Sequence, residues 1–265
     1  GQKIEEELFD RNLNLLVSGS MSNRLDALLL IHDIVIADNE ETREFLRIKA
    51  DDLIKALYVT LKNVFEKSKN EVPLKFAFYF LNMTHKLCSI RAFLKNVTEE
   101  NLKKFSEELL QRLLAEDDEK RFDAADNENL VKTLNAIMLR VLENAEADDM
   151  YNVLFDLLIK NRRVHSYAKI LGLIVKCILK LTKALNQLVP TLHPETLLIK
   201  FHLYILEFGA AQTEDIGIKT IKTLLNELVK VYHESIWNSY ARSVQIHSKP
   251  DQVLHSYLRF CISLK

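Results

Sequence analysis

Apolar residues recur at spacings of three and four along nearly the whole chain, and the strict alternation typical of β-strands is absent. Leu25, Leu28 and Leu29 illustrate the spacing, as do Leu130 and Leu134 further on. It is the pattern of helices with one buried face. We therefore expect helices at about 8–16, 25–35, 41–48, 51–67, 73–90, 98–113, 130–141, 149–160, 164–185, 194–208, 218–231, 236–244 and 250–264.

Glycine and proline stand at the ends of these expected helices. Gly19 interrupts the pattern and Ser20 follows it, a residue type that caps helix N-termini. Gly209 ends the expected helix 194–208. Proline suits a first helical turn, and three of the four prolines stand where a helix is expected to start: Pro73, Pro194 and Pro250.

The expected helices form a unit of helix, short loop, helix and longer step, which recurs about six times at a spacing of roughly 40 residues. A period of about 40 to 47 residues built from antiparallel helix pairs is typical of HEAT or armadillo solenoids. The sequence thus predicts an all-α fold, with residues 1–265 forming one α-solenoid domain of about six HEAT-like antiparallel helix pairs. A helical bundle of irregular connectivity is the alternative, and the regular period favours the solenoid.

The composition narrows the classes of fold and partner. The 265 residues include 5 glycines and 4 prolines, too few for the many tight turns of an all-β fold or for a glycine-cradled nucleotide site. The net charge of −1 gives no whole-chain field that attracts nucleic acid or an anionic membrane. No apolar stretch is close in length to the roughly 18 residues that a helix needs to span a bilayer. We expect neither nucleic acid nor membrane as a partner.

The three cysteines, Cys88, Cys177 and Cys261, lie far apart within apolar helical runs. Reduced, buried thiols of a cytosolic protein have this placement. The chain begins directly in a helical pattern with no targeting segment, so we expect a piece of a longer cytoplasmic protein.

No group of residues nominates a catalytic or metal centre. The glycines are isolated, which gives no phosphate loop. His233 and Glu234 begin like a zinc-protease helix, but Trp237 stands where the second histidine ligand is required. Five further histidines lie singly on different expected helices: His32, His85, His165, His202 and His255. We expect no enzyme, no cofactor and no metal.

Charge is therefore compared loop by loop, because solenoids bind along the edge where their intra-repeat loops line up. The third expected loop is acidic, with Glu116, Asp117, Asp118 and Glu119 at its centre, whereas the first, second and fourth carry basic residues. Such loops are also explained as solvated surface, and this interpretation stays open. The candidate protein-binding residues at the loop edge are Arg24, Lys69, Lys75, Arg162, Arg163 and Lys219.

Several stretches occur in order along nearly the whole chain: LNLLVSGS at 13–20, NRLDAL at 23–28, LVKTLN at 130–135, RVLE at 140–143 and IKTIKTLL at 218–225. Together they resemble the final TOG domain of the Minispindles, ch-TOG and Zyg family of microtubule polymerases. The resemblance implies a six-repeat HEAT domain from the C-terminal end of a large protein of the cytoplasm and cytoskeleton. It further implies action at spindle poles, centrosomes and microtubule plus ends during mitosis.

The sequence departs from the pattern by which earlier TOG domains of this family bind tubulin. There the first loop presents a tryptophan followed by basic residues. Here Met21 and Ser22 stand at those places and only Arg24 fits, while Trp237 lies in the last repeat. The acidic third loop would also repel tubulin, whose surface is acidic. Both observations argue against ordinary tubulin binding.

The family's terminal region is instead associated with TACC-type coiled-coil adaptors, helped by a short helical extension that we expect to follow Lys265. Our first hypothesis is therefore a non-catalytic interaction module that contributes to recruitment through such an adaptor, with tubulin and microtubules reached through the parent protein. The second is a TOG domain that binds tubulin through divergent basic loops. The third is a HEAT-type scaffold of unrelated machinery that binds a peptide in an apolar groove.

Overall fold

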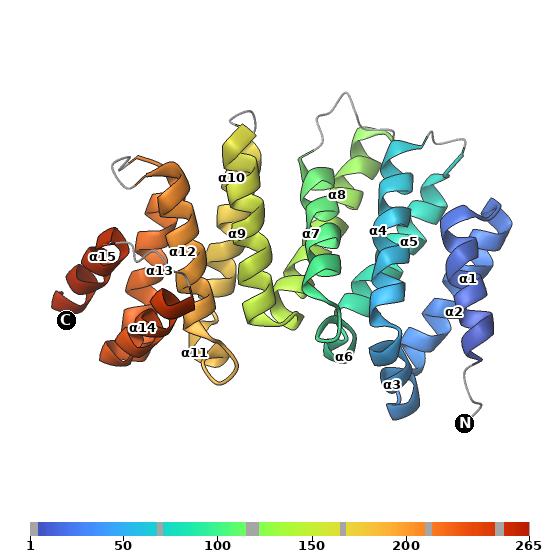
Figure 1. The fold of residues 1–265 in the computed structure, drawn as a ribbon. Helices are drawn as coiled ribbons and strands as arrows, with labels where there is room; N and C mark the ends of the chain where they lie inside the picture. Colours follow the sequence, from blue (N-terminus) through green and yellow to red (C-terminus); the bar gives the residue numbers. More distant parts are fainter. Residues whose placement is uncertain are drawn as a thin grey trace. The chain divides into compact units, whose positions relative to one another are not determined.

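The computed structural model describes residues 5–67, 71–114, 122–164, 168–209, 214–246 and 252–264. Every regular element within these ranges is a helix, which confirms the all-α prediction. The chain divides into two compact units, residues 1–146 and residues 147–265. Each unit is a stack of antiparallel helix pairs, the packing of HEAT-like repeats (Figure 1).

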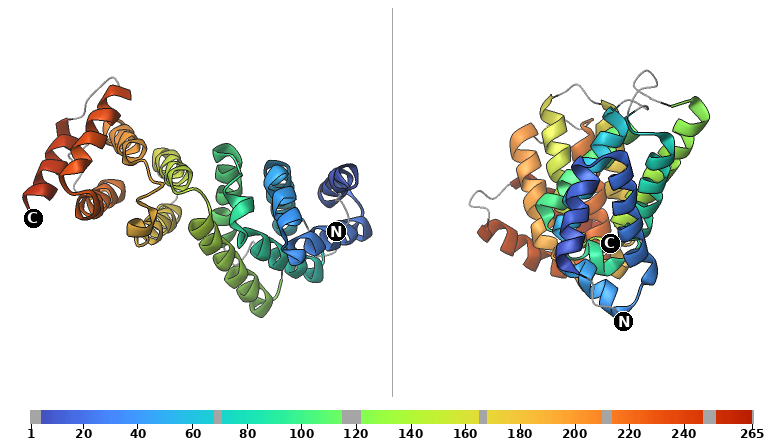
Figure 2. Two further views of the ribbon diagram at one scale, coloured as in Figure 1. Left: turned by 90° about the horizontal axis from the view of Figure 1, so that it is seen from below. Right: turned by 90° about the vertical axis from the view of Figure 1, so that its right-hand side faces the viewer.

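In the first unit the paired helices form two layers (Figure 2). One layer contains α1 (Glu6–Ser18), α4 (Ala50–Glu66) and α7 (Glu99–Leu113). The other contains α2 (Met21–Ala37), α5 (Leu74–Cys88) and α8 (Ala124–Asn144). The short helices α3 (Glu40–Ile48) and α6 (Arg91–Leu94) connect successive pairs and contact each other.

The second unit repeats this arrangement. One layer contains α9 (Ala147–Val164), α12 (Pro194–Phe208) and α14 (Ile236–Ile246). The other contains α10 (Ala168–Thr182), α13 (Ile216–Tyr232) and α15 (Gln252–Ser263). A short α11 (Leu185–Leu188) precedes α12, and a 3₁₀ turn, His233–Ser235, links α13 to α14. Within the described ranges, the two units together provide the six or so helix pairs that the period predicts.

Local chemistry explains where several helices begin and end. The Oγ of Ser20 accepts a hydrogen bond from the amide of Asn23 at 3.3 Å, so it caps α2 as expected. Pro194 occupies the first turn of α12, and Gly209 ends that helix with a φ of 80°, a conformation that favours glycine. Pro73 precedes the first residue of α5. Pro250 lies outside the described residues.

The core of each unit lies between its two layers and contains large aromatic side chains, each at most 1% exposed. In the second unit, Phe155 of α9 and Phe201 of α12 meet edge to face with ring centroids 5.3 Å apart. Fully burying one such ring contributes roughly 1.5–3 kcal/mol. The largest buried aromatics of the first unit are Phe9, Phe76, Phe80, Phe93 and Phe105, and those of the second are Tyr151, Phe155, Phe201 and Tyr204.

An aspartate near the start of a helix ties neighbouring pairs together in both units. Asp51 of α4 accepts hydrogen bonds from the backbone amide of Thr98 at 2.9 Å and from its hydroxyl at 3.0 Å. Asp148 of α9 accepts one from the backbone amide of His193 at 2.9 Å, just before α12. Each aspartate thus fixes the start of the next helix in its own layer. Thr98 stands at the N-cap of α7, but its hydroxyl donates to Asp51 and does not cap the helix.

The fourth expected loop, residues 160–163, is not a loop. Helix α9 continues through Val164, so Arg162 and Arg163 form its last turn. Two features explain the longer helix. Cations are favourable at a helix C-terminus, and both arginines pair with acidic residues of the α12–α13 region. The sequence pattern also missed the short helices α6 and α11, which are too brief to show a period.

Candidate interaction surfaces

Arg24 lies in the first turn of α2 and folds back onto α1. Its Nη2 donates to the carbonyl oxygen of Val17 at 3.2 Å, and its Nε is buried. The last carbonyls of a helix carry a partial negative charge, which this guanidinium satisfies. Arg24 is therefore engaged within the first unit. Beside it, Met21 and Ser22 form the start of α2.

Lys75 is the candidate cation of the first unit whose charge faces outward. It is exposed in the first turn of α5, and its Nζ lies 5.6 Å from the ring centroid of Tyr79. No ion pair involves it among the residues that the structure describes. Lys69 lies outside the described residues.

Arg162 is held in a buried polar cluster of the second unit. Its Nε donates to Oδ1 of Asp215 at 2.9 Å, and the side chains are 16% and 4% exposed respectively. The guanidinium also lies 5.0 Å from the ring centroid of Phe208. The other carboxylate oxygen of Asp215 accepts hydrogen bonds from the hydroxyl of Tyr204 and from the backbone amide of Ile218. The cluster joins α9, α12 and the N-terminus of α13.

The hydrogen bonds keep Asp215 ionised. Burial alone would raise the pKa of its carboxyl group, but the bonds from Tyr204, Arg162 and the amide of Ile218 outweigh burial and hold the pKa below its usual value. Burial and the neighbouring carboxylate raise the pKa of the Tyr204 phenol. The cluster is thus a largely buried ion pair that engages the Arg162 guanidinium within the second unit, and the predicted role of this residue in binding stays a prediction.

Arg163 and Lys219 are the exposed candidate cations of the second unit. Nη2 of Arg163 lies 2.7 Å from a carboxylate oxygen of Glu207, and Nζ of Lys219 lies 2.7 Å from one of Glu214. Exposed pairs of this kind contribute little to stability and exchange readily with other partners. These two residues remain available for binding, and their predicted role stays a prediction.

The acidic loop is described only in part, because residues 115–121 lie outside the described ranges. Asp123 stands at the N-cap of α8, and Asp126 lies in its first turn, where negative charge is favourable. Glu128 pairs with Lys132 one turn further on at 3.2 Å. The described acidic residues are thus explained by the helix that they begin.

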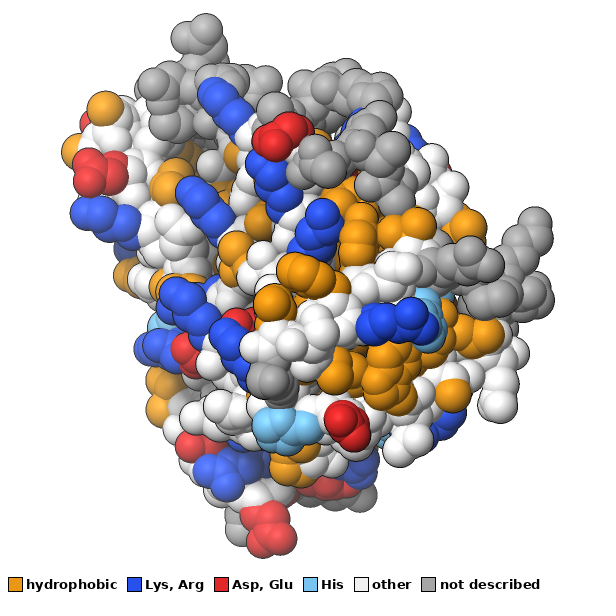
Figure 3. All heavy atoms as spheres, turned by 90° about the vertical axis from the view of Figure 1, so that its left-hand side faces the viewer, with side chains coloured by type: hydrophobic (Ala, Val, Ile, Leu, Met, Phe, Trp, Pro, Cys, Tyr) orange, Lys and Arg blue, Asp and Glu red, His pale blue; other side chains and the backbone are white. Residues whose placement is uncertain are grey.

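Trp237 lies in an aromatic cluster between α14 and α15. Its ring centroid is 5.6 Å from that of Tyr240 and 4.9 Å from that of His255. Figure 3 views the molecule from the side of α15, where hydrophobic side chains gather among basic ones. Phe260 and Leu264 of the α15 region are exposed. The tryptophan therefore packs helices together, which is a structural role.

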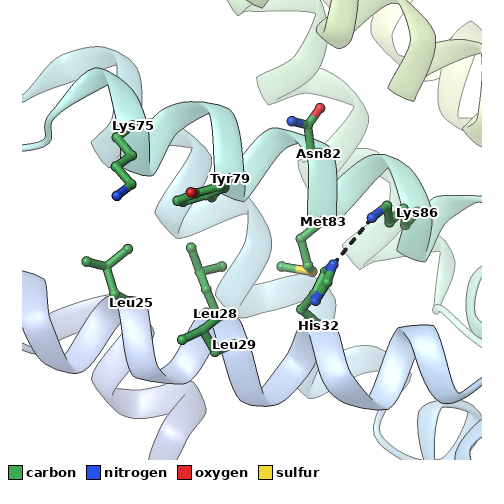
Figure 4. Close-up of a pocket in the computed structure, with 9 residues that line it drawn as sticks. All are labelled: Leu25, Leu28, Leu29, His32, Lys75, Tyr79, Asn82, Met83 and Lys86. Atoms are coloured by element: carbon green, nitrogen blue, oxygen red, sulfur yellow. Dashed lines mark hydrogen bonds between the residues drawn. The ribbon is translucent and has the colours of Figure 1, made fainter.

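A groove of about 560 Å³ runs between α2 and α5 (Figure 4). Leu25, Leu28 and Leu29 line it from α2, and Tyr79 and Met83 line it from α5. Polar side chains complete the wall: His32, Lys75, Asn82 and Lys86. Pockets of about 300 to 1,000 Å³ hold most specific ligands. The sequence pattern placed these leucines on the buried face of the expected helix 25–35, so it did not locate this groove, although a peptide-binding apolar groove belongs to the third hypothesis.

The described residues contain no cluster of histidine, cysteine and carboxylate side chains able to hold a metal ion. Cys88, Cys177 and Cys261 are free and buried, as predicted, and burial raises the pKa of the Cys177 thiol to about 11. Among the described helices none combines the length and apolarity needed to cross a bilayer.

The fold and surfaces define a HEAT-like helical-repeat module with an apolar groove and an internal ion-pair cluster. No family model and no solved structure match the chain. It is 29% identical over 234 residues to Protein MOR1 of Oryza sativa subsp. japonica, covering 79% of this chain and 11% of that protein. It is 27% identical over 268 residues to Protein MOR1 of Arabidopsis thaliana, covering 93% and 13%.

These relatives support a relationship to the ch-TOG family of microtubule polymerases, the family that the sequence resembles. The chain spans little more than a tenth of the length of either relative.

Proposed function

We propose that the chain is a non-catalytic interaction module of a microtubule-associated protein and corresponds to the final TOG domain of that protein. In this proposal residues 1–265 act as one module. It contributes to recruitment of the parent protein to spindle poles, centrosomes and microtubule plus ends through a TACC-type coiled-coil adaptor. It binds tubulin dimers weakly or not at all.

The observation that carries the proposal is the sequence similarity to the two MOR1 proteins over most of the chain. The engagement of Arg24 and Arg162 within the fold supports the weak tubulin binding, because two of the six candidate cations are directed into the protein. The polar, small residue Ser22 at the expected basic position supports it further.

Binding of the purified chain to a TACC-type coiled coil and to tubulin dimers tests the proposal. With each protein at about 10 μM, a concentration at which a micromolar dissociation constant gives substantial complex, we expect the coiled coil to bind the chain and tubulin to elute separately from it. A second protein that continues past Lys265 into the native sequence measures what the following residues add. The proposal would be contradicted if tubulin bound while neither the 265-residue chain nor the longer protein bound the coiled coil.

The alternative is tubulin binding through the basic residues. The exposed positions Lys75, Arg163 and Lys219 favour it, because their cations are reachable from solvent. Charge reversal at Lys75 and Lys219 should then abolish tubulin binding, and binding should weaken as salt rises. Lys176→Glu, on the exposed side of α10, is the matched control. Arg162 is unsuitable for this test, because reversing its charge would disrupt the buried pair with Asp215.

A further inference from the structure

We propose that the groove between α2 and α5 is a docking site for an amphipathic helix with an acidic residue near each end of its apolar stripe. The inference concerns the first unit alone and does not depend on the adaptor or on the family of the parent protein.

The α5 wall of the groove has a helical periodicity that a helix can match. Lys75, Tyr79, Asn82 and Lys86 follow one another at spacings of four, three and four, so they form one stripe along α5. Eleven residues of helix span about 16 Å, or three turns. Figure 4 shows Lys75 near Leu25 and Lys86 near His32, with Tyr79 facing α2 between them, whereas the Asn82 side chain points away from α2.

The floor of the groove is apolar and partly exposed. Leu28 is buried at its base, whereas Leu29 is 60% exposed and Tyr79 is 53% exposed. Met83 is buried on the α5 side and has a flexible side chain that adapts to an incoming group. These residues give a partner's apolar side chains a surface to cover, in a groove of about 560 Å³.

The two ends of the groove are positively charged. Lys75 lies at one end over the Tyr79 ring. At the other end Nζ of Lys86 lies 3.3 Å from Nε2 of His32, which accepts its hydrogen bond and leaves the charge of the lysine unneutralised. Asp26 and Asp33 of α2 do not line the groove. Charge complementarity therefore selects an occupant that is acidic at both ends and apolar between them.

The backbone chemistry favours a helical occupant over an extended one. The walls are helices whose amide and carbonyl groups are bonded within each helix, so they offer no free edge to a β-strand. A bound extended peptide would bury unsatisfied backbone groups, which is costly. A helix satisfies its own backbone and presents its side chains at the spacing of the α5 stripe.

A synthetic helical peptide tests the proposal against the whole 265-residue chain. The probe carries glutamate at positions i and i+11 and leucine at i+4 and i+7, with alanine, glutamine and lysine elsewhere and a fluorescent label. All four residues then lie on one face. In fluorescence anisotropy we expect saturable binding that weakens with salt. A peptide with lysine in place of both glutamates, and one with alanine in place of both leucines, should bind at least tenfold more weakly.

Variants of the chain locate the site. Leu29→Arg and the double charge reversal of Lys75 and Lys86 should each weaken the probe at least tenfold, because they remove the apolar contact or the two cations. Leu206→Arg is the matched control, since Leu206 lies on α12 of the second unit and is 50% exposed. These positions are exposed, so folding should persist, and circular dichroism of each variant verifies it.

Two outcomes would overturn the proposal. One is a failure of the probe to bind at this groove, seen either as no binding or as binding that Leu29→Arg and Leu206→Arg reduce equally. The other is concentration-dependent dimerisation that Leu29→Arg abolishes in sedimentation, which would assign the groove to a second copy of this chain. The microtubule proposal stands or falls separately, because neither outcome uses an adaptor or tubulin.

Discussion

Gly217 and Gly172 provide a test of the second unit, because the same substitution should affect them oppositely. Both lie inside helices, Gly217 near the start of α13 and Gly172 in α10. A Cβ added at Gly172 meets no atom within 4 Å, whereas one added at Gly217 overlaps the ring and hydroxyl of Tyr204. The bare backbone at Gly217 thus lets Tyr204 reach Asp215.

The expected free energies follow from these surroundings. Replacing a helical glycine by alanine in open space stabilises a protein by roughly 0.5–1 kcal/mol, and we expect this for Gly172→Ala. At Gly217 overpacking costs about 1–3 kcal/mol. Displacing Tyr204 also removes a hydrogen bond to a carboxylate, worth roughly 1.5–3 kcal/mol. After the gain in helix propensity of about 0.5–1 kcal/mol, Gly217→Ala should destabilise the unit by about 1.5–5.5 kcal/mol.

Urea unfolding followed by tryptophan fluorescence measures both effects. Trp237 is the single tryptophan and lies in α14, so its emission reports on the second unit. With a slope of about 1–3 kcal/mol per molar urea, the Gly217→Ala midpoint should fall by at least about 0.5 M and the Gly172→Ala midpoint should rise slightly. If Gly217→Ala is as stable as Gly172→Ala, the close packing of Tyr204 against α13 is wrong.

Three further outcomes follow from the same structure. Asp215→Ala should lower the free energy of unfolding in urea by about 3 kcal/mol, because it removes a helix cap and leaves Arg162 without its buried partner. Glu214→Ala is the control: its side chain is 88% exposed, so the change should be less than about 0.5 kcal/mol. Folding lowers the pKa of Asp215, so the contribution of its carboxylate to stability is complete above an unfolded pKa of about 3.9 and is lost as the pH falls through the lower folded value. Between about pH 5 and 2.5 the melting temperature of Asp215→Asn should therefore fall less steeply than that of the unsubstituted chain. Burial raises the pKa of the Cys88 thiol, so iodoacetamide should leave it unmodified in the native chain and alkylate it in urea, as mass spectrometry would show.

The helices were predictable because each must bury one face, which imposes a period on the sequence. The pattern located α2, α4, α5 and α12 to within a few residues, as well as the caps Ser20 and Gly209. It failed where a helix end depends on a distant partner. The last turn of α9 carries polar residues and its sequence predicts a loop, yet it is helical and Arg162 donates a hydrogen bond to Asp215, 53 positions later.

A repeated signal in the sequence could have revealed one structural tie. Ala-Asp-Asp occurs at 50–52 and again at 147–149, at the start of α4 and of α9. In both places the first aspartate accepts a backbone amide 45 to 47 residues further on, before the next helix of the layer. The distance from each aspartate to its amide matches one repeat period, and the two strings start 97 residues apart, about two periods, so a search for short strings at multiples of the period would have found both aspartates.

The candidate site was less predictable than the fold, because the sequence shows which residues are basic but not which of them pair with acidic groups or carbonyls of the same chain. Arg24 and Arg162 turn inward to satisfy carbonyls or a carboxylate, whereas Lys75 lies over Tyr79 at the end of a groove. The groove depends on which of two adjacent apolar residues faces the core, and a helix buries Leu28 while it exposes Leu29. When the apolar stripe of a helix is wider than the neighbouring helix can cover, part of it stays exposed and a second surface is needed to bury it. In the first unit that surface lies between α2 and α5, where lysines at both ends set the charge of the helix that would cover it.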